Sequence, residues 1–125
     1  MNFIKLIIIF FFISTAAFGV MTNKEKLVCI QMHTINFALE MFKIDNNVFP
    51  TTDEGLDSLL NNPNKEKYPN YFQEGYLGMQ QIPKDIWHNS FHYKLSRDKV
   101  NITSSGTDGV IGNSDDIHFP SCISE

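Results

Sequence analysis

The sequence predicts an α+β domain in which one N-terminal amphipathic helix packs on a small antiparallel sheet. Apolar residues recur at helical spacing over residues 23–46, and three short runs between residues 91 and 119 alternate apolar and polar side chains. An acidic, glycine-rich loop separates the last two of these runs. The 125 residues are enough for a single domain of this kind.

Residues 1–19 have the pattern of a targeting segment. Lys5 precedes an unbroken apolar run over residues 6–13, and residues 17–19 have the small-x-small spacing of a signal-peptidase site. Apolar character over residues 6–21, interrupted by Ser14 and Thr15, is marginally short for a bilayer span of about 20 residues. We expect a secretory signal or, alternatively, an N-terminal membrane anchor, followed by a domain over residues 20–125. Either way we expect that domain to be exported from the cytoplasm, free or tethered to a membrane.

The net charge of the chain indicates which classes of partner it can bind. Without residues 1–19 the chain keeps 9 basic and 14 acidic residues, a net charge of −5. Nucleic acids and anionic lipid surfaces attract basic proteins, so this balance disfavours both and suits a protein that binds cations.

The helix is expected over residues 23–46. Its apolar stripe has steps of three and four residues, formed by Val28, Met32, Ile35, Leu39 and Phe42. Asn46 and Asn47 provide a left-handed stop.

A second, short helix is expected to begin at Thr51 or Thr52, because Thr51 and Glu54 have the spacing of a capping box. Residues 91–95, 100–103 and 117–119 are the expected strands. Lys84 and Asp85, before the first strand, are expected to form a solvated pair.

The loop over residues 104–117 is the strongest candidate for a site. It contains three glycines and the carboxylates Asp108, Asp115 and Asp116. Like charges this close repel one another, and calcium would relieve the repulsion because it takes about six to eight oxygen ligands. The spacing is not that of an EF-hand. The alternative is a solvated hairpin turn without metal.

The two cysteines, Cys29 and Cys122, stand near opposite ends of the domain. An even cysteine count in an exported protein favours a disulfide. The alternative is a zinc site, since His33 and His118 each lie four residues from one of the cysteines.

Several segments resemble one known family. Residues 38–47 and 49–56 resemble the end of the helix and the following loop in the major pseudopilin of the type II secretion system. Residues 75–77 and 82–85, with Trp87 and Asn89, resemble that family's next segment. Residues 105–109 and 115–117 resemble its acidic loop, so the resemblance runs in order from about residue 35 to residue 117.

The resemblance implies a type IV pilin-like head with a calcium site in the acidic loop. Carried over by position, the ligands would be the side chains of Asp108, Asp115 and Asp116 and the carbonyl of Ser105. Asn113 is a further candidate, through its side chain or its carbonyl. The implied partners are other pseudopilins or secretion-system components, with inner-membrane association through the N-terminal segment.

Two segments depart from the family pattern. Family members carry a long apolar helix after the leader glycine, with glutamate at its fifth position. Here Lys24 stands at the fifth position after Gly19, and no long apolar helix follows. Ile86 and His88 replace the proline and glycine that usually flank the tryptophan, so we expect this turn to differ in shape.

No motif of a nucleophile with its base, and no phosphate-binding glycine loop, occurs in the sequence. We therefore expect a non-enzymatic, calcium-stabilised structural subunit of type II protein secretion. The alternative is a free periplasmic binding module with a pseudopilin-like head that enters no filament.

Overall fold

The computed structural model describes residues 21–123 and consists of one long helix, a three-stranded sheet and two short 3₁₀ turns. The prediction of a signal or anchor over residues 1–19 lies outside the described residues. Within residues 21–123, no helix is both long and apolar enough to cross a bilayer.

Helix α2 (Asn23–Asn46) confirms the expected helix at both ends. Thr22 and Glu25 form a capping box at its start: the Thr22 side chain accepts a hydrogen bond from Glu25 N, and Thr22 N donates to Glu25 Oε2. At its end Asn47 has a left-handed backbone (φ 65°), and its N–H donates to the carbonyl of Lys43.

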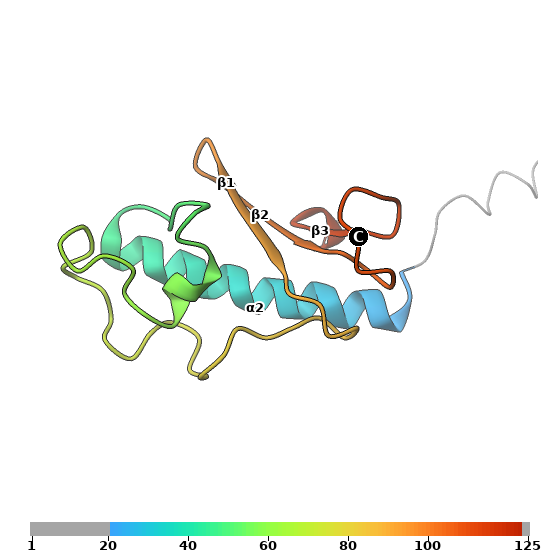
Figure 1. Ribbon diagram of the computed structural model, residues 1–125, viewed down its shortest axis with the longest axis horizontal. Helices are drawn as coiled ribbons and strands as arrows, with labels where there is room; N and C mark the ends of the chain where they lie inside the picture. The colour runs from blue at the N-terminus through green and yellow to red at the C-terminus, as the bar shows by residue number, and fades with distance from the viewer. Residues whose placement is uncertain (1–20, 124–125) are drawn as a thin grey trace, which may run out of the picture.

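The sheet is an antiparallel meander in the order β1 (His92–Ser96), β2 (Lys99–Ser104) and β3 (Ile117–Phe119). A tight hairpin joins β1 to β2, with Arg97 and Asp98 both at positive φ. The sheet lies over one face of α2, which contacts β2 and β3 (Figure 1). The predicted fold class and all three strands are confirmed.

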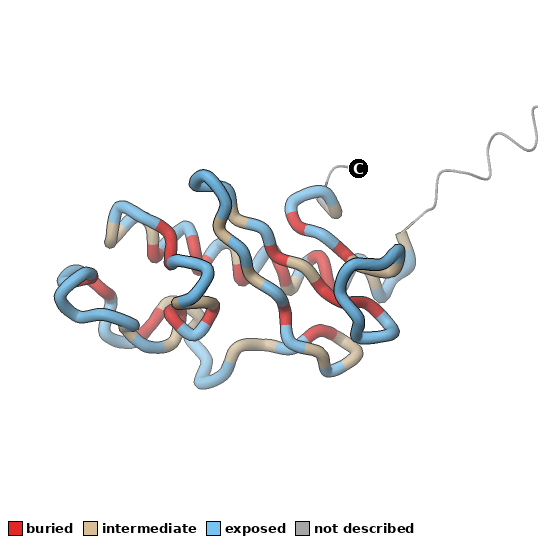
Figure 2. The backbone as a smooth tube through the Cα atoms, turned by 45° about the horizontal axis from the view of Figure 1, so that its top comes forward, coloured by how far each residue is buried: buried red, intermediate tan, exposed pale blue. Residues whose placement is uncertain are grey.

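The core lies between α2, the sheet and the segment after the helix (Figure 2). The predicted stripe of α2 is buried, as are aromatic side chains from the loops. The largest fully buried side chains of the core are Tyr68, Phe42, Met32, Ile35, Leu39, Leu59 and Ile102. Phe42 packs edge-on against Tyr68 and Tyr71, with ring centroids 4.9 and 5.9 Å apart.

The expected second helix is shorter than predicted. The capping box at Thr51 and Glu54 is present, with hydrogen bonds in both directions, but only the 3₁₀ turn η1 (Leu56–Leu59) follows it. Gly55 interrupts the run with φ 62°, outside the helical region. The capping box was therefore predicted correctly, and the length and type of the helix after it were not.

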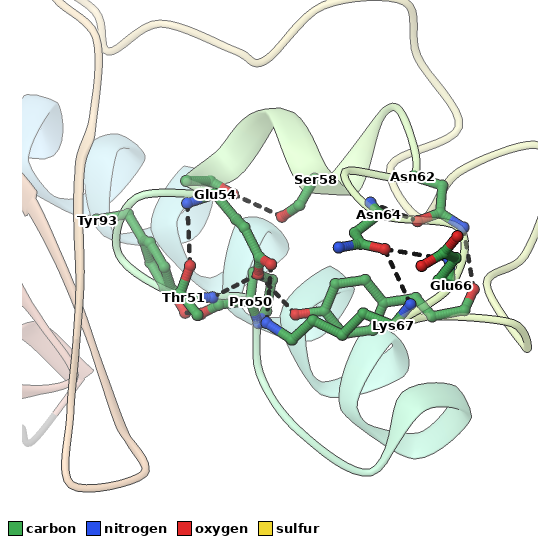
Figure 3. A network of polar contacts seen from close by, with 11 residues as sticks. Pro50, Thr51, Glu54, Ser58, Asn62, Asn64, Glu66, Lys67 and Tyr93 are labelled. Atoms are coloured by element: carbon green, nitrogen blue, oxygen red, sulfur yellow. Dashed lines mark hydrogen bonds and ion pairs between the residues drawn. The ribbon is translucent and has the colours of Figure 1, made fainter.

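Glu54 holds this segment to the loop after it (Figure 3). Its carboxylate accepts hydrogen bonds from Thr51 N (2.8 Å), Lys67 Nζ (2.8 Å) and the Tyr68 hydroxyl (2.6 Å). Burial acts to raise the pKa of Glu54, but the hydrogen bonds from these groups outweigh it and hold the pKa below its ordinary value.

Glu54→Gln should therefore weaken the fold near neutral pH by about 0.5–1 kcal/mol, the range of a partly exposed ion pair. A lowered pKa gives stability above the unfolded value of about 4.3, and this stability is lost as pH falls through the folded value. Urea unfolding should thus show a difference from the parent at pH 7 that shrinks towards pH 3. Glu66→Gln, exposed in the same loop, is the control. A difference that does not change with pH would contradict the assignment.

Candidate metal centre

The acidic loop joins β2 to β3, at the end of the molecule where α2 begins (Figure 1). It includes all five predicted metal ligands. Ser105 is buried directly after β2, Asp115 and Asp116 are half-buried directly before β3, and Asp108 and Asn113 are exposed between them. The two ends of the loop are held together because Ser104 pairs with Ile117.

Asp115 and Asp116 each have one carboxylate oxygen with a hydrogen-bond donor and one without. Asp115 Oδ2 accepts from Asp108 N (3.1 Å), and Asp116 Oδ2 accepts from Gly112 N (2.7 Å). The Oδ1 atoms of both residues are buried and have no hydrogen-bond partner among the described residues. Buried carboxylate oxygens without donors are costly, and a cation is a group that satisfies them.

Both carboxylate oxygens of Asp108 accept hydrogen bonds from other residues of the loop. Its Oδ1 accepts from Val110 N (2.9 Å), and its Oδ2 accepts from the side-chain amide of Asn113. The hydrogen bond from Val110 is the largest influence holding the pKa of Asp108 below its ordinary value. The carboxylate is therefore charged at neutral pH and shapes the loop, whether or not it also binds a metal.

Gly106 allows the two ends of the loop to approach closely. Its φ is +67°, and a Cβ at this position would overlap the main-chain oxygen and the carboxylate of Asp115. Only glycine leaves that space open, directly against the main chain and the carboxylate of Asp115.

The three aspartates have no cationic partner among residues 21–123, where the ion pairs are Lys43–Asp98 and Lys67–Glu54. No three acidic, histidine or cysteine side chains converge to hold a metal in that part of the chain. Calcium also takes main-chain carbonyls and water as ligands. The donor set of the loop, with its two unpartnered buried oxygens, fits a hard divalent cation, and the individual ligands remain predictions.

Asp85 is hydrogen-bonded to Ser104, the last residue of β2 before the acidic loop. The expectation that Asp85 forms a solvated pair with Lys84 was wrong. Asp85 is 3% exposed rather than solvated, and it makes no ion pair with Lys84. Its Oδ1 accepts from Trp87 N (3.0 Å) and Asn89 N (2.9 Å), and its Oδ2 accepts from Ser104 Oγ (2.8 Å).

The turn around Asp85 also contacts the loop directly. Ser104 Oγ accepts from Gly106 N (3.2 Å), and the Asn89 side chain donates to the Gly106 carbonyl (3.4 Å). His88 has φ 66°, the left-handed conformation that glycine adopts most easily, so this position keeps a glycine-like backbone without glycine.

Asp85→Asn should destabilise the domain by about 1–2 kcal/mol, because an amide donor replaces an acceptor within a buried hydrogen-bonded network. The measurement is urea unfolding at pH 7. Asp57→Asn, exposed on η1, is the matched control and should change little. Equal stability of Asp85→Asn and the parent would show that the network contributes nothing to the fold.

Cys29 and Cys122 form a disulfide that ties α2 to η2 (Ser121–Ile123) across 93 residues of sequence. The disulfide prediction is confirmed, and the zinc alternative is excluded because both sulfurs are consumed in the bond. His33 packs against Phe119, and His118 exchanges a hydrogen bond with Thr103.

The family model described as type II secretion system protein G matches residues 20–119. The type II secretion system core protein G of Vibrio cholerae is 36% identical over 96 residues, which cover 72% of this chain and 64% of that protein. The corresponding protein of Aeromonas hydrophila is 35% identical over 105 residues, 79% of this chain and 73% of that protein.

A crystal structure shares the fold as well. The major pseudopilin of the type 2 secretion system of enterohaemorrhagic Escherichia coli superposes with a TM-score of 0.68 at 28% identity, covering 81% of this chain and 92% of that one. The order of the motifs, the fold and the family match agree over α2, the loops that follow it and the three strands. The chain belongs to the family of type II secretion system protein G.

Proposed function

We propose that this chain is a non-enzymatic structural subunit of the type II secretion pseudopilus, exported to the periplasm, with a head stabilised by calcium. The observation that supports the proposal is the family match over residues 20–119, which includes the acidic loop together with the helix and sheet. The matched part spans 64% of the Vibrio cholerae relative, so its assembly with other pseudopilins is part of the proposal.

The proposed calcium ion would be held by the side chains of Asp108, Asp115 and Asp116 and the Ser105 carbonyl, with Asn113 as a further ligand. Calcium supplies positive charge to a loop that carries three carboxylates and no cationic side chain. The two unpartnered buried oxygens, Asp115 Oδ1 and Asp116 Oδ1, support the site. Ion binding to the folded form adds stability by mass action.

Deletion of the gene in its own host tests the structural role. We expect the loss of extracellular secretion, restoration by the parent gene, and crosslinks between the chain and other secretion-system components. Normal secretion in the deletion strain, together with no crosslinks to the chain in the complemented strain, would contradict the structural role.

A free periplasmic module is the second candidate, and the start of α2 favours it. The Thr22 side chain caps the first turn of α2 by accepting from Glu25 N, and Thr22 itself has an extended backbone (ψ 158°), so the α2 helix begins there. N-terminal sequencing with cell fractionation separates the candidates. A mature protein that begins at Val20 and is free of membrane supports the module, and retention of residues 3–21 in the membrane fraction supports a tethered subunit.

A further inference from the structure

Helix α2 has a second apolar face, which the core does not cover. Its members are spaced alternately by three and four residues, and all are exposed: Leu27, Ile30, Thr34, Phe37, Met41 and Ile44. Ile30, Phe37 and Ile44 are each more than 60% exposed. We call these six residues the outer seam.

The outer seam has the geometry of a two-stranded coiled-coil contact. A strict alternation of three and four residues is a heptad pattern, with Leu27, Thr34 and Met41 at the first apolar position and Ile30, Phe37 and Ile44 at the second. At 100° per residue this seam lies nearly opposite the stripe that faces the core. Two copies that meet along it would therefore hold their sheets on the outside, clear of each other.

A contiguous apolar face of this length on an exported, acidic domain indicates a protein contact. We propose that the outer seam pairs with the outer seam of a second copy of this chain, with the two α2 helices antiparallel about a two-fold axis. In that arrangement Leu27 faces Ile44 of the second copy, Ile30 faces Met41, and Thr34 faces Phe37.

The charged residues beside the seam determine the direction of pairing. In the antiparallel register, Asp45 lies beside Lys24 of the second copy, and Glu40 lies beside His33, whose imidazole N–H can donate to the carboxylate. The two-fold axis makes each of these contacts twice. A parallel pair in register would instead place Glu40 beside Asp45 twice, which is repulsive.

The shape of the surface agrees with this register. A groove of about 630 Å³ runs beside the first half of the seam, lined in part by Ile30, His33 and Thr34. The antiparallel register brings Phe37 of the second copy opposite Thr34, so that the largest side chain of one seam meets the smallest of the other at this groove. Size complementarity of this kind is how a knob enters its hole in a coiled coil.

The contact is small, so we expect a reversible dimer with a dissociation constant of about 10–100 μM. Sedimentation of the full chain in its native, oxidised form over about 5–500 μM tests it. Phe37→Glu should weaken the dimer at least tenfold because it places a carboxylate in the apolar seam. Phe37→Leu is the matched control and should keep the dimer.

Charge exchange tests the direction. Asp45→Lys should weaken an antiparallel dimer because it faces Lys24, and Lys24→Asp combined with Asp45→Lys should restore it. A parallel dimer would respond in the opposite way, since a lysine at position 45 would face Glu40. Asp45 also accepts a hydrogen bond from Tyr76 (3.0 Å), so far-ultraviolet circular dichroism must first show that the variants are folded.

Three results would overturn the proposal: a monomer throughout the concentration range, a dimer that Phe37→Glu does not weaken, or tightening by Asp45→Lys. A monomer whose melting temperature falls with Phe37→Glu would mean that another part of the same chain covers the seam. The proposal does not depend on entry into a filament, so its failure leaves the structural role untouched.

Discussion

Removal of the disulfide should cause the largest loss of stability. Replacing both Cys29 and Cys122 by alanine is expected to lower the free energy of unfolding by about 4–5 kcal/mol, since the bond closes a loop of roughly 90 residues in the unfolded chain. For a domain of this size that corresponds to a fall in melting temperature on the order of 20 °C. The measurement is calorimetry or urea unfolding of the oxidised parent and the double variant.

The position of the bond explains why its loss should weaken the link between α2 and η2. It joins α2 to the last described turn, and η2 makes few other contacts with the helix. The reductant dithiothreitol provides the control: it should lower the stability of the parent towards that of the variant and leave the variant unchanged. A variant within about 1 kcal/mol of the oxidised parent would show that the unfolded chain is already compact, so that the crosslink constrains little.

Local chemistry made the main elements predictable. The capping asparagine after α2, the alternation in the three strands and the glycines of the acidic loop each depend on residues close in sequence, and the structure confirms the elements that they predicted. The capping box at Thr51 and Glu54 was also a correct local signal. Gly55 then takes a positive φ that no local pattern indicated, and the helix does not continue.

The features that the sequence did not predict depend on packing between distant segments. Asp85 follows a lysine, which suggested a solvated pair, yet its partners are main-chain groups of the next turn and a serine of β2. The outer seam was missed because α2 is apolar on two faces. Spacing alone assigned one stripe to the core, and only the sheet and the following loops determine which face is covered.

The two unpartnered oxygens of the acidic loop lead to the second large effect, on calcium dependence. At a calcium concentration one hundred times the dissociation constant, binding should raise the free energy of unfolding of the parent by about 2.7 kcal/mol. Asp115→Asn and Asp116→Asn should each remove most of this gain, because each replaces an anionic oxygen ligand by a neutral one. Thermal unfolding in calcium and in chelator measures the gain.

The same variants should behave in the opposite way without the ion. The parent then keeps three carboxylates in one loop with no ion-pair partner among residues 21–123, and loss of one charge relieves repulsion. In chelator the asparagine variants should therefore equal or slightly exceed the parent in stability, while in calcium they fall below it. Asp53→Asn, exposed and outside the loop, should keep the full calcium gain.

This reversal, in which the variants are less stable than the parent in calcium but not in chelator, distinguishes a metal site from a loop with a purely structural role. A loop held by hydrogen bonds alone would lose stability from Asp115→Asn equally in both buffers. Magnesium is a further control, because it demands a tighter octahedral shell and should give a smaller gain than calcium in a loop built from main-chain and carboxylate oxygens. If the parent melts identically in calcium and in chelator, the buried oxygens of Asp115 and Asp116 are satisfied by something other than this ion, and calcium has no part in the stability of the head.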